Sequence, residues 1–391
     1  MSSEQVDKKT NEGWFLYQKI AVIVLTAILI FILLNLVSLI TIKIIKGKSS
    51  DKIIKTDFHI IYPRYSKDEI RTLWKETTLR SFQYDPYTQF RERPYQGKYV
   101  HIDAQSFRHN RNQASWPPQK DHYNIFFFGG STGFGWGVSD EETIASHLQD
   151  LLASSNQPKV SIYNFSQGAF FSLQERAFFE QLILSGFQPD MAIFFDGLNE
   201  CSVNEPLYTE NLKLLFDGKT SPLFSQFPLF KIFKHFKKNR ENKKRWESEE
   251  KNEMTKPIIQ RYLSNKTMIE KIGKEYDIKT VFVWQPVPFY QYNLDLNPFI
   301  DEETKQDPRF YRSKNVYPRM ETLFKDGQVG ENFLWLADMQ TNLNKPLYVD
   351  RIHYSDEMSS YIASKIYDFI EKETEKKTQT GDNSLESVKV S

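Results

Sequence analysis

The stretch Asn124-Ile-Phe-Phe-Phe-Gly-Gly-Ser-Thr-Gly133 decides how this 391-residue chain is expected to fold. Its four apolar residues, Ile125 to Phe128, lie between a polar residue and a pair of glycines, which is typical of a strand buried on both faces of a parallel sheet. Ser131 follows directly, and the glycines on either side of it allow a tight turn. The pattern therefore predicts a hydroxyl at the carboxyl edge of a sheet. Two interpretations stay open at this point, a nucleophile and a plain turn that contains serine.

Composition limits the classes of function. The formal net charge is +1, so the overall charge gives no basis for a nucleic-acid partner. The single cysteine, Cys201, excludes an internal disulfide framework. The seven histidines include no His-x-x-x-His pair and no Cys-His cluster. We therefore predict one or two domains, no metal site and no cofactor.

Residues 20–42 carry no charged side chain, and a segment of about 23 residues is long enough to cross a bilayer core of roughly 30 Å. We predict one transmembrane helix here. A cleaved signal peptide is the alternative, but its apolar region would be shorter and would end at a cleavage site of small residues. Lys43, Lys46 and Lys48 follow instead. A buried core helix is the third interpretation.

Downstream of this segment the pattern changes twice. Residues 43–120 form a juxtamembrane and N-terminal extension that is rich in Tyr, Arg and Pro. Its aromatic content is too high for a disordered tether, so we expect it to pack on the following domain. Residues 121–372 alternate short apolar runs with helical periodicity, which favours a parallel sheet with crossover helices. The flank 1–19 precedes the transmembrane helix, and the charged tail 373–391 is predicted to be disordered.

The predicted strands of this domain share a run of buried-type residues followed by polar or glycine residues. They are 124–128, 160–165, 191–195, 280–284 and 333–336. Between the third and fourth, residues 201–256 form an insertion with an apolar first half and a second half of mixed charge. Three interpretations apply to it: an amphipathic lid over a cleft, a helix lying in the membrane interface, or a plain insertion packed on the body.

Four strand or loop ends carry the residue types that acyl chemistry needs. Serine is a weak nucleophile at neutral pH and requires a base, for which His353 is the best candidate. Asp350 can reach the other imidazole nitrogen on a tight turn and stabilise the imidazolium. The backbone N–H groups of Ser131 and Gly168 and the side-chain amide of Asn199 are candidate donors to an oxyanion. Each of these pieces has an ordinary interpretation as turn or cap chemistry, and only their order in the chain sets them apart.

That order resembles the SGNH (GDSL-type) hydrolases over about residues 124–370, in the form found in membrane-anchored bacterial members. The resemblance puts Ser131 on the nucleophile, Gly168 and Asn199 on the oxyanion-hole residues, and Asp350 and His353 on the acid and base. It implies a flavodoxin-like three-layer α/β/α sandwich with a central parallel sheet. The chain departs from the family pattern at three positions, where Gly130, Ser166 and Glu200 replace Asp, Gly and Asp. None of these changes removes a catalytic group, but they leave the substrate class undecided.

Two competing motifs fit less well. The letters Gly129-Gly-Ser-Thr-Gly133 also match the Gly-x-Ser-x-Gly elbow of the α/β-hydrolases, but in that fold several strands precede the elbow, and its acid and base lie on separate loops. A dinucleotide fingerprint fails because Gly133, Gly135 and Gly137 have the wrong third spacing.

The resemblance implies a membrane-anchored serine esterase that acts through an acyl-enzyme on O-acylated carbohydrate or another ester. A carbohydrate O-acetyltransferase of envelope or extracellular polysaccharide and a non-catalytic carbohydrate-binding scaffold are the alternatives. It also implies that the domain lies outside the cytoplasm, although the count of lysines around residues 20–42 weakly favours the opposite orientation. The sequence does not identify any protein partner, and whether one exists stays undecided.

Overall fold

The computed structural model describes residues 3–54, 60–154, 159–201, 227–230, 255–301, 304 and 307–379. The chain forms two compact units, one made of residues 1–55 and 210–251 and the other of residues 56–209 and 252–391. Most of the predicted insertion, 201–256, lies outside the described residues, so its three interpretations stay predictions.

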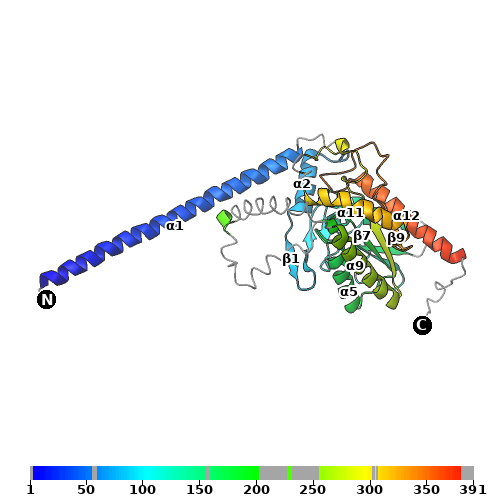
Figure 1. Cartoon of the computed structure of the whole chain (residues 1–391), viewed down its shortest axis with the longest axis horizontal. Helices are drawn as coiled ribbons and strands as arrows, with labels where there is room; N and C mark the ends of the chain where they lie inside the picture. Colours follow the sequence, from blue (N-terminus) through cyan, green and yellow to red (C-terminus); the bar gives the residue numbers. More distant parts are fainter. Residues whose placement is uncertain are drawn as a thin grey trace. The chain divides into compact units, whose positions relative to one another are not determined.

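The first unit contains helix α1 (Ser3–Ile54), which Figure 1 shows as one continuous helix. Within it, Trp14–Ile42 is long and apolar enough to cross a membrane, with a mean hydropathy of 3.1, and its side chains are almost entirely exposed. Its polar side chains are satisfied within the helix: the Thr26 hydroxyl and the Asn35 amide donate to carbonyls four residues earlier. Such internal pairing is what a helix in hydrocarbon requires.

The second unit is built on a five-stranded parallel sheet with the strand order β6-β5-β7-β8-β9. The strands are β5 (Tyr123–Gly129), β6 (Val160–Asn164), β7 (Met191–Asp196), β8 (Lys279–Trp284) and β9 (Phe333–Trp335). All five coincide with predicted strands, and the predicted fold class is confirmed. Because β5 pairs with β6 on one side and β7 on the other, its carboxyl end is flanked by the carboxyl ends of these two strands.

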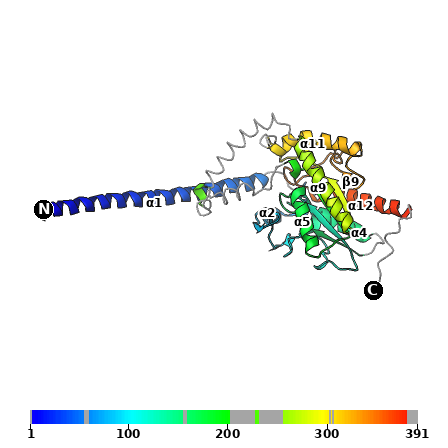
Figure 2. The ribbon, with the colours of Figure 1, turned by 60° about the horizontal axis from the view of Figure 1, so that its bottom comes forward.

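Helices cover both faces of the sheet, so the fold has three layers (Figures 1 and 2). Strand β5 shows the physical reason, since Phe126 and Phe128 belong to one buried cluster and Ile125 and Phe127 to the other. The first cluster includes side chains of α5 (Ser172–Leu184), α9 (Thr255–Glu275) and α11 (Pro308–Lys325). The second includes side chains of α4 (Ile144–Ser154) and α12 (Asp356–Gln379).

Two helices differ from expectation. The sequence does not predict α11, because Pro318 lies inside it and proline removes a helical hydrogen bond. Helix α12 continues to Gln379 and so enters the segment 373–391 that the sequence predicts as a disordered tail. The residues after Ile370 are mostly Glu, Lys and Thr, and the long charged side chains among them are good helix formers.

Of the predicted N-terminal extension, residues 43–54 belong to helix α1, and residues 60–120 are folded and pack on the sheet domain. It contains α2 (Lys67–Thr78), the hairpin of β1 (Phe82–Asp85) and β2 (Gln89–Glu92), and the short pair β3 (Tyr95–Gln96) and β4 (His101–Ile102). Phe90 and Phe107 are fully buried in the same cluster as α5 and α9. The extension is therefore part of the domain's core and brings its polar residues close to the carboxyl edge of the sheet.

Candidate active site

Ser131 stands where the sequence predicts it, at the carboxyl end of β5. It is the first residue of the single-turn helix α3 (Ser131–Phe134), and the preceding Gly130 is extended. A Cβ at Gly130 would lie 2.2 Å from Nδ2 of Asn199, so only glycine allows that amide to come this close. Gly130 therefore leaves room for the Asn199 amide beside Ser131.

The structure brings Ser131, His353 and Asp350 together. His353 Nε2 lies 2.8 Å from Ser131 Oγ, and His353 Nδ1 lies 2.6 Å from a carboxylate oxygen of Asp350. Ser131 is 8% exposed and His353 is 5% exposed, so this hydrogen-bonded chain is largely shielded from water. Serine, imidazole and carboxylate are thus arranged in the order in which a proton would leave the hydroxyl.

A tight turn fixes Asp350 relative to His353. The second carboxylate oxygen of Asp350 accepts the backbone N–H groups of Ile352 and His353 at 2.8 and 2.7 Å. Burial would raise the pKa of Asp350, but the charge and hydrogen bond of His353 and these two backbone donors outweigh it, and the pKa lies below its usual value. Asp350 therefore stays ionised at neutral pH.

Two of the three predicted oxyanion donors are placed beside the serine. Ser131 opens α3, and the first N–H groups of a helix have no partner within it. The Asn199 amide touches Gly130 and uses one N–H to donate to the carbonyl of Phe170 at 2.7 Å. A primary amide has a second N–H, which suits it to donate to an oxygen near Ser131.

Gly168, the third predicted donor, has a different partner in this structure. Its N–H donates to a carboxylate oxygen of Glu92 at 3.4 Å, so its role in an oxyanion hole stays a prediction. Burial raises the pKa of Glu92, and the guanidinium of Arg80, 3.1 Å from its other oxygen, opposes that shift. The sequence gives no sign of this contact, because Glu92 belongs to the extension and to a different strand pair.

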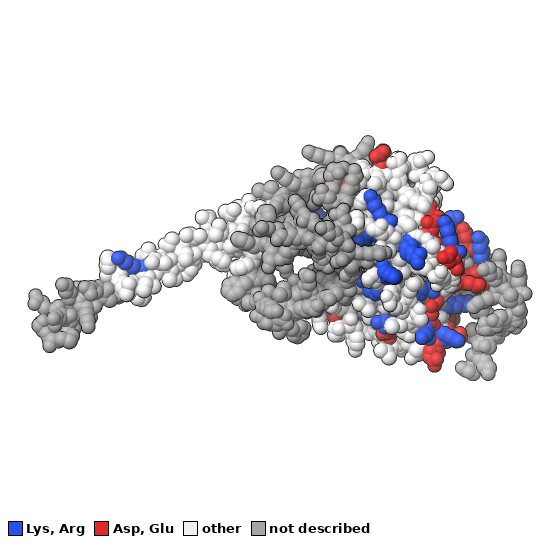
Figure 3. All heavy atoms as spheres, viewed as in Figure 1, with Lys and Arg blue, Asp and Glu red and all other residues white. Residues whose placement is uncertain are grey.

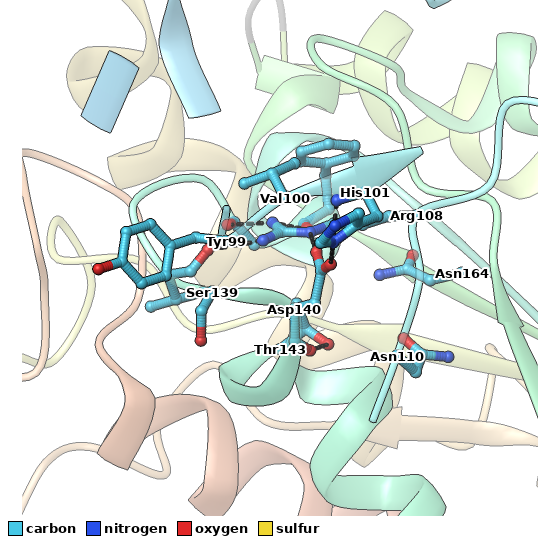
Figure 4. Close-up of polar contacts among 12 residues, drawn as sticks. Tyr99, Val100, His101, Arg108, Asn110, Ser139, Asp140, Thr143 and Asn164 are labelled. Atoms are coloured by element: carbon cyan, nitrogen blue, oxygen red, sulfur yellow. Dashed lines mark hydrogen bonds and ion pairs between the residues drawn. The ribbon is translucent and has the colours of Figure 1, made fainter. Parts of the chain in front are cut away.

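Arg108 of the extension holds the loop that follows Ser131, and Figure 4 shows its side chain beside Asp140 and His101. Its guanidinium is completely buried and donates to three backbone carbonyls, those of Phe134, Gly135 and Val138, at 2.7, 2.5 and 2.6 Å. Its Nε donates to Asp140 at 2.9 Å, and the other oxygen of that carboxylate accepts both the backbone N–H and Nδ1 of His101. These contacts fix residues 134–138, which we call the Ser131 loop.

The Ser131 loop contacts two of the predicted catalytic residues, Ser131 and His353. The N–H groups of Gly135 and Trp136 both donate to the carbonyl of Ser131 at 3.1 Å. The indole of Trp136 lies 5.3 Å from the His353 ring, centroid to centroid, and a Cβ at Gly168 would meet it at 3.1 Å. The sequence contained a signal for this loop, since Gly135 and Gly137 both have positive φ, but a run of Gly and aromatic residues does not identify its role.

Comparisons with known proteins give fold neighbours. No family model and no curated protein matches the chain. Solved structures that resemble it include a lipase/acylhydrolase from Enterococcus faecalis at 12% identity, covering 64% of this chain and 96% of that one, with a TM-score of 0.35. The acetyl xylan esterase AlAXEase is similar at 14% identity, over 63% of this chain and 98% of that one, with a TM-score of 0.36. A carbohydrate acetylesterase family member from Sinorhizobium meliloti is similar at 10% identity, over 63% of this chain and 96% of that one, with a TM-score of 0.36. The functional assignment below therefore rests on the geometry of the site.

Proposed function

We propose that this protein is a membrane-anchored serine esterase that removes acyl groups from O-acylated carbohydrate. The observation that carries the proposal is the continuous hydrogen-bonded chain from Ser131 through His353 to Asp350. Ser131 lies more than two hundred residues before the turn that carries Asp350 and His353. A nucleophile, a base and an orienting carboxylate at hydrogen-bond distance are the recognised signature of nucleophilic catalysis.

The geometry supports a two-step reaction. His353 Nε2 takes the proton of Ser131 as Oγ attacks the ester carbonyl carbon, and Asp350 stabilises the imidazolium that forms. When the tetrahedral intermediate collapses, the bond to the alcohol oxygen breaks, and His353 returns the proton to the leaving alcohol. Water then attacks the acyl-Ser131 ester, with His353 again as the base, and releases the acid and the free serine.

The negative charge of both intermediates needs donors that are already in place. The donors that we propose for the former carbonyl oxygen are the Ser131 N–H at the start of α3 and the Asn199 amide beside Gly130. Loss of one such donor typically raises the barrier by about 3–4 kcal/mol. We include Gly168 as a third donor only if its N–H turns from Glu92 toward the substrate.

The decisive experiment replaces Ser131 with alanine in the full-length protein and measures hydrolysis of p-nitrophenyl acetate. We expect kcat to fall by about 10⁴-fold or more, because removing one member of such a unit removes nearly all of its effect. Ser185→Ala, at the exposed end of α5, is the matched control and should keep wild-type turnover. Full turnover by the Ser131→Ala variant would overturn the assignment of the nucleophile.

A reactive phosphonate distinguishes hydrolysis from the alternatives kept open by the sequence. Labelling of Ser131 together with release of free acetate supports an esterase. Labelling with acetyl transfer to an added oligosaccharide, and little free acetate, indicates a transferase. Absence of labelling indicates a binding scaffold.

Membrane anchoring through Trp14–Ile42, with the sheet domain outside the cytoplasm, is the final part of this proposal. The length and hydropathy of the segment support a spanning helix. We expect a protease added outside intact cells to remove the domain that follows residue 55. A domain that becomes accessible only after cell lysis would show the opposite orientation.

A further inference from the structure

A cavity of about 400 Å³ lies in the N-terminal extension, where the end of α2 faces the link between β2 and β3. Its lining consists of Lys75, Leu79, Arg80, Ser81, Arg93, Pro94 and Tyr95. The lining has three charged side chains, Lys75, Arg80 and Arg93, and all three are cationic. We call this hollow the basic cavity.

The charge of the basic cavity is a local feature. The whole chain has a net charge of +1, and the face seen in Figure 3 carries both basic and acidic side chains. A concave site with cations and no carboxylate in its lining concentrates positive potential more than a flat surface of mixed charge does. An anion would therefore be attracted to this site in particular.

Arg80 gives the cavity a donor that lacks a partner. Its side chain is only 5% exposed, and one terminal nitrogen pairs with Glu92 at 3.1 Å. Its Nε is buried without a hydrogen-bond partner among the described residues. A buried N–H of a charged group is costly to leave unsatisfied, so a shift of Arg80 toward an anion in the cavity would give this N–H an acceptor.

The cavity is linked to the candidate active site through this arginine. Arg80 binds one oxygen of Glu92, and the other oxygen of Glu92 accepts the N–H of Gly168. The Arg80 guanidinium also lies 4.8 Å from the centre of the Phe134 ring, in the helix that Ser131 opens. A ligand in the basic cavity would thus lie next to residues that contact the catalytic turn.

Its remaining lining suits a sugar. Tyr95 offers an aromatic ring, with the Arg80 guanidinium 5.8 Å from its centre, and Ser81 offers a hydroxyl. Planar guanidinium groups such as those of Arg80 and Arg93 bind carboxylate and phosphate oxygens well. We infer that the basic cavity is a subsite for an acidic sugar unit, recognised by its carboxylate or phosphate, in the carbohydrate whose ester group is at Ser131. This inference rests on the proposed function, which gives the reaction, and it adds that the carbohydrate substrate is negatively charged.

The test measures binding without turnover. Oligogalacturonate, which carries one carboxylate per sugar, is titrated into the full-length Ser131→Ala protein at low and high salt, and a neutral cello-oligosaccharide of equal length is titrated in parallel. We expect the acidic oligosaccharide to bind more tightly and to lose affinity as salt rises. The paired substitution Lys75→Gln and Arg93→Gln should weaken its binding about tenfold or more, since bonds to charged groups are the stronger ones.

Controls separate this inference from folding and from catalysis. Lys271→Gln with Lys274→Gln changes two exposed cations of α9 outside the cavity lining and should leave the affinity unchanged. Thermal unfolding of each variant shows that the fold is kept. Equal affinity for acidic and neutral oligosaccharides, or no effect of the Lys75 and Arg93 pair, would overturn the subsite even if Ser131 proves to be the nucleophile.

Two further probes identify the source of the anion. Competition by galactose 1-phosphate supports an acidic sugar recognised through phosphate. Binding to phosphatidylglycerol vesicles that depends on Lys75 and Arg93, without binding of either sugar probe, would instead make the cavity a lipid contact and refute the inference.

Discussion

Replacing Arg108 with lysine tests whether the N-terminal extension sets the geometry around Ser131. Arginine offers five donors in a fixed plane, and here they reach three backbone carbonyls and Asp140. One ammonium group cannot reach all four acceptors at once. At least two would lose their donor, and a buried acceptor without a partner costs roughly 1–3 kcal/mol. We therefore expect the free energy of unfolding to fall by about 2–6 kcal/mol, a large part of the ~5–15 kcal/mol typical of a folded domain.

The same substitution should lower turnover. The Ser131 loop carries Trp136 against His353, and its N–H groups hold the carbonyl of Ser131. A displacement of about 1 Å in such a support can reduce the rate on the order of 10²-fold. Because the loop positions the reacting groups and does not itself bind a small ester, kcat should fall more than KM rises.

The assay combines denaturant unfolding, followed by tryptophan fluorescence, with p-nitrophenyl acetate kinetics below the unfolding transition. Arg111→Lys is the matched control, since Arg111 pairs with Asp150 at a partly exposed position, where such pairs contribute only about 0.2–1 kcal/mol. If Arg108→Lys keeps its stability within about 0.5 kcal/mol and its kcat within about twofold, the proposed role of this loop is wrong.

Three other substitutions test separate parts of the structure. Asp350→Asn should reduce kcat about 10⁴-fold by favouring the wrong imidazole tautomer. Because the pKa of Asp350 is lowered in the folded protein, its ionised form stabilises the fold above the unfolded pKa of about 3.9, and this stabilisation is lost as pH falls. Wild type and variant should therefore unfold alike in strong acid. Glu175→Gln should flatten the dependence of the free energy of unfolding on pH, because burial raises the pKa of Glu175 in the folded protein. The free energy of unfolding of the wild type should fall by up to ~1.4 kcal/mol per pH unit as pH rises above about 4.3. Parallel plots of this free energy against pH for wild type and variant would contradict the prediction. Gly130→Asp, which restores the residue usual in the resembling family, should lower kcat because its Cβ would displace the Asn199 amide, and undiminished activity would show that the amide is not needed there.

Much of the sheet domain could be predicted because its information is local. Each strand is a short run of buried residues, and the residues at its end follow within a few positions, as in 124–133. Parallel strands bring their carboxyl ends to one edge, so the order of the motifs along the chain was enough to place Ser131 near His353. Helix α11 was missed because Pro318 lies inside it, where proline removes a helical hydrogen bond, and the helix is stabilised by its buried face.

The contribution of the extension could not be predicted, because its key contacts join residues that are far apart in sequence and follow no periodic pattern. Arg108 is one arginine among many, and its sequence neighbours do not show that its donors reach carbonyls about thirty residues further along the chain. Glu92 meets Gly168 across a still longer separation. Aromatic and arginine content indicated that the segment packs on the domain, but not which groups it binds.

These contacts assign different roles in the candidate active site to the sheet domain and to the N-terminal extension. The sheet edge supplies the groups that we propose to react, Ser131, His353 and Asp350. The extension holds the loop after Ser131 through Arg108, and its Glu92 accepts from the candidate oxyanion donor Gly168. A carboxylate beside a developing oxyanion would oppose catalysis unless its charge is compensated, and Arg80 is the cation in contact with it. An anionic ligand that draws Arg80 away from Glu92 would alter that balance. If the basic cavity binds an acidic sugar as we propose, substrate charge should affect the rate at Ser131 through the extension, and a sheet domain without residues 60–120 should lack both its stability and its response to acidic carbohydrate.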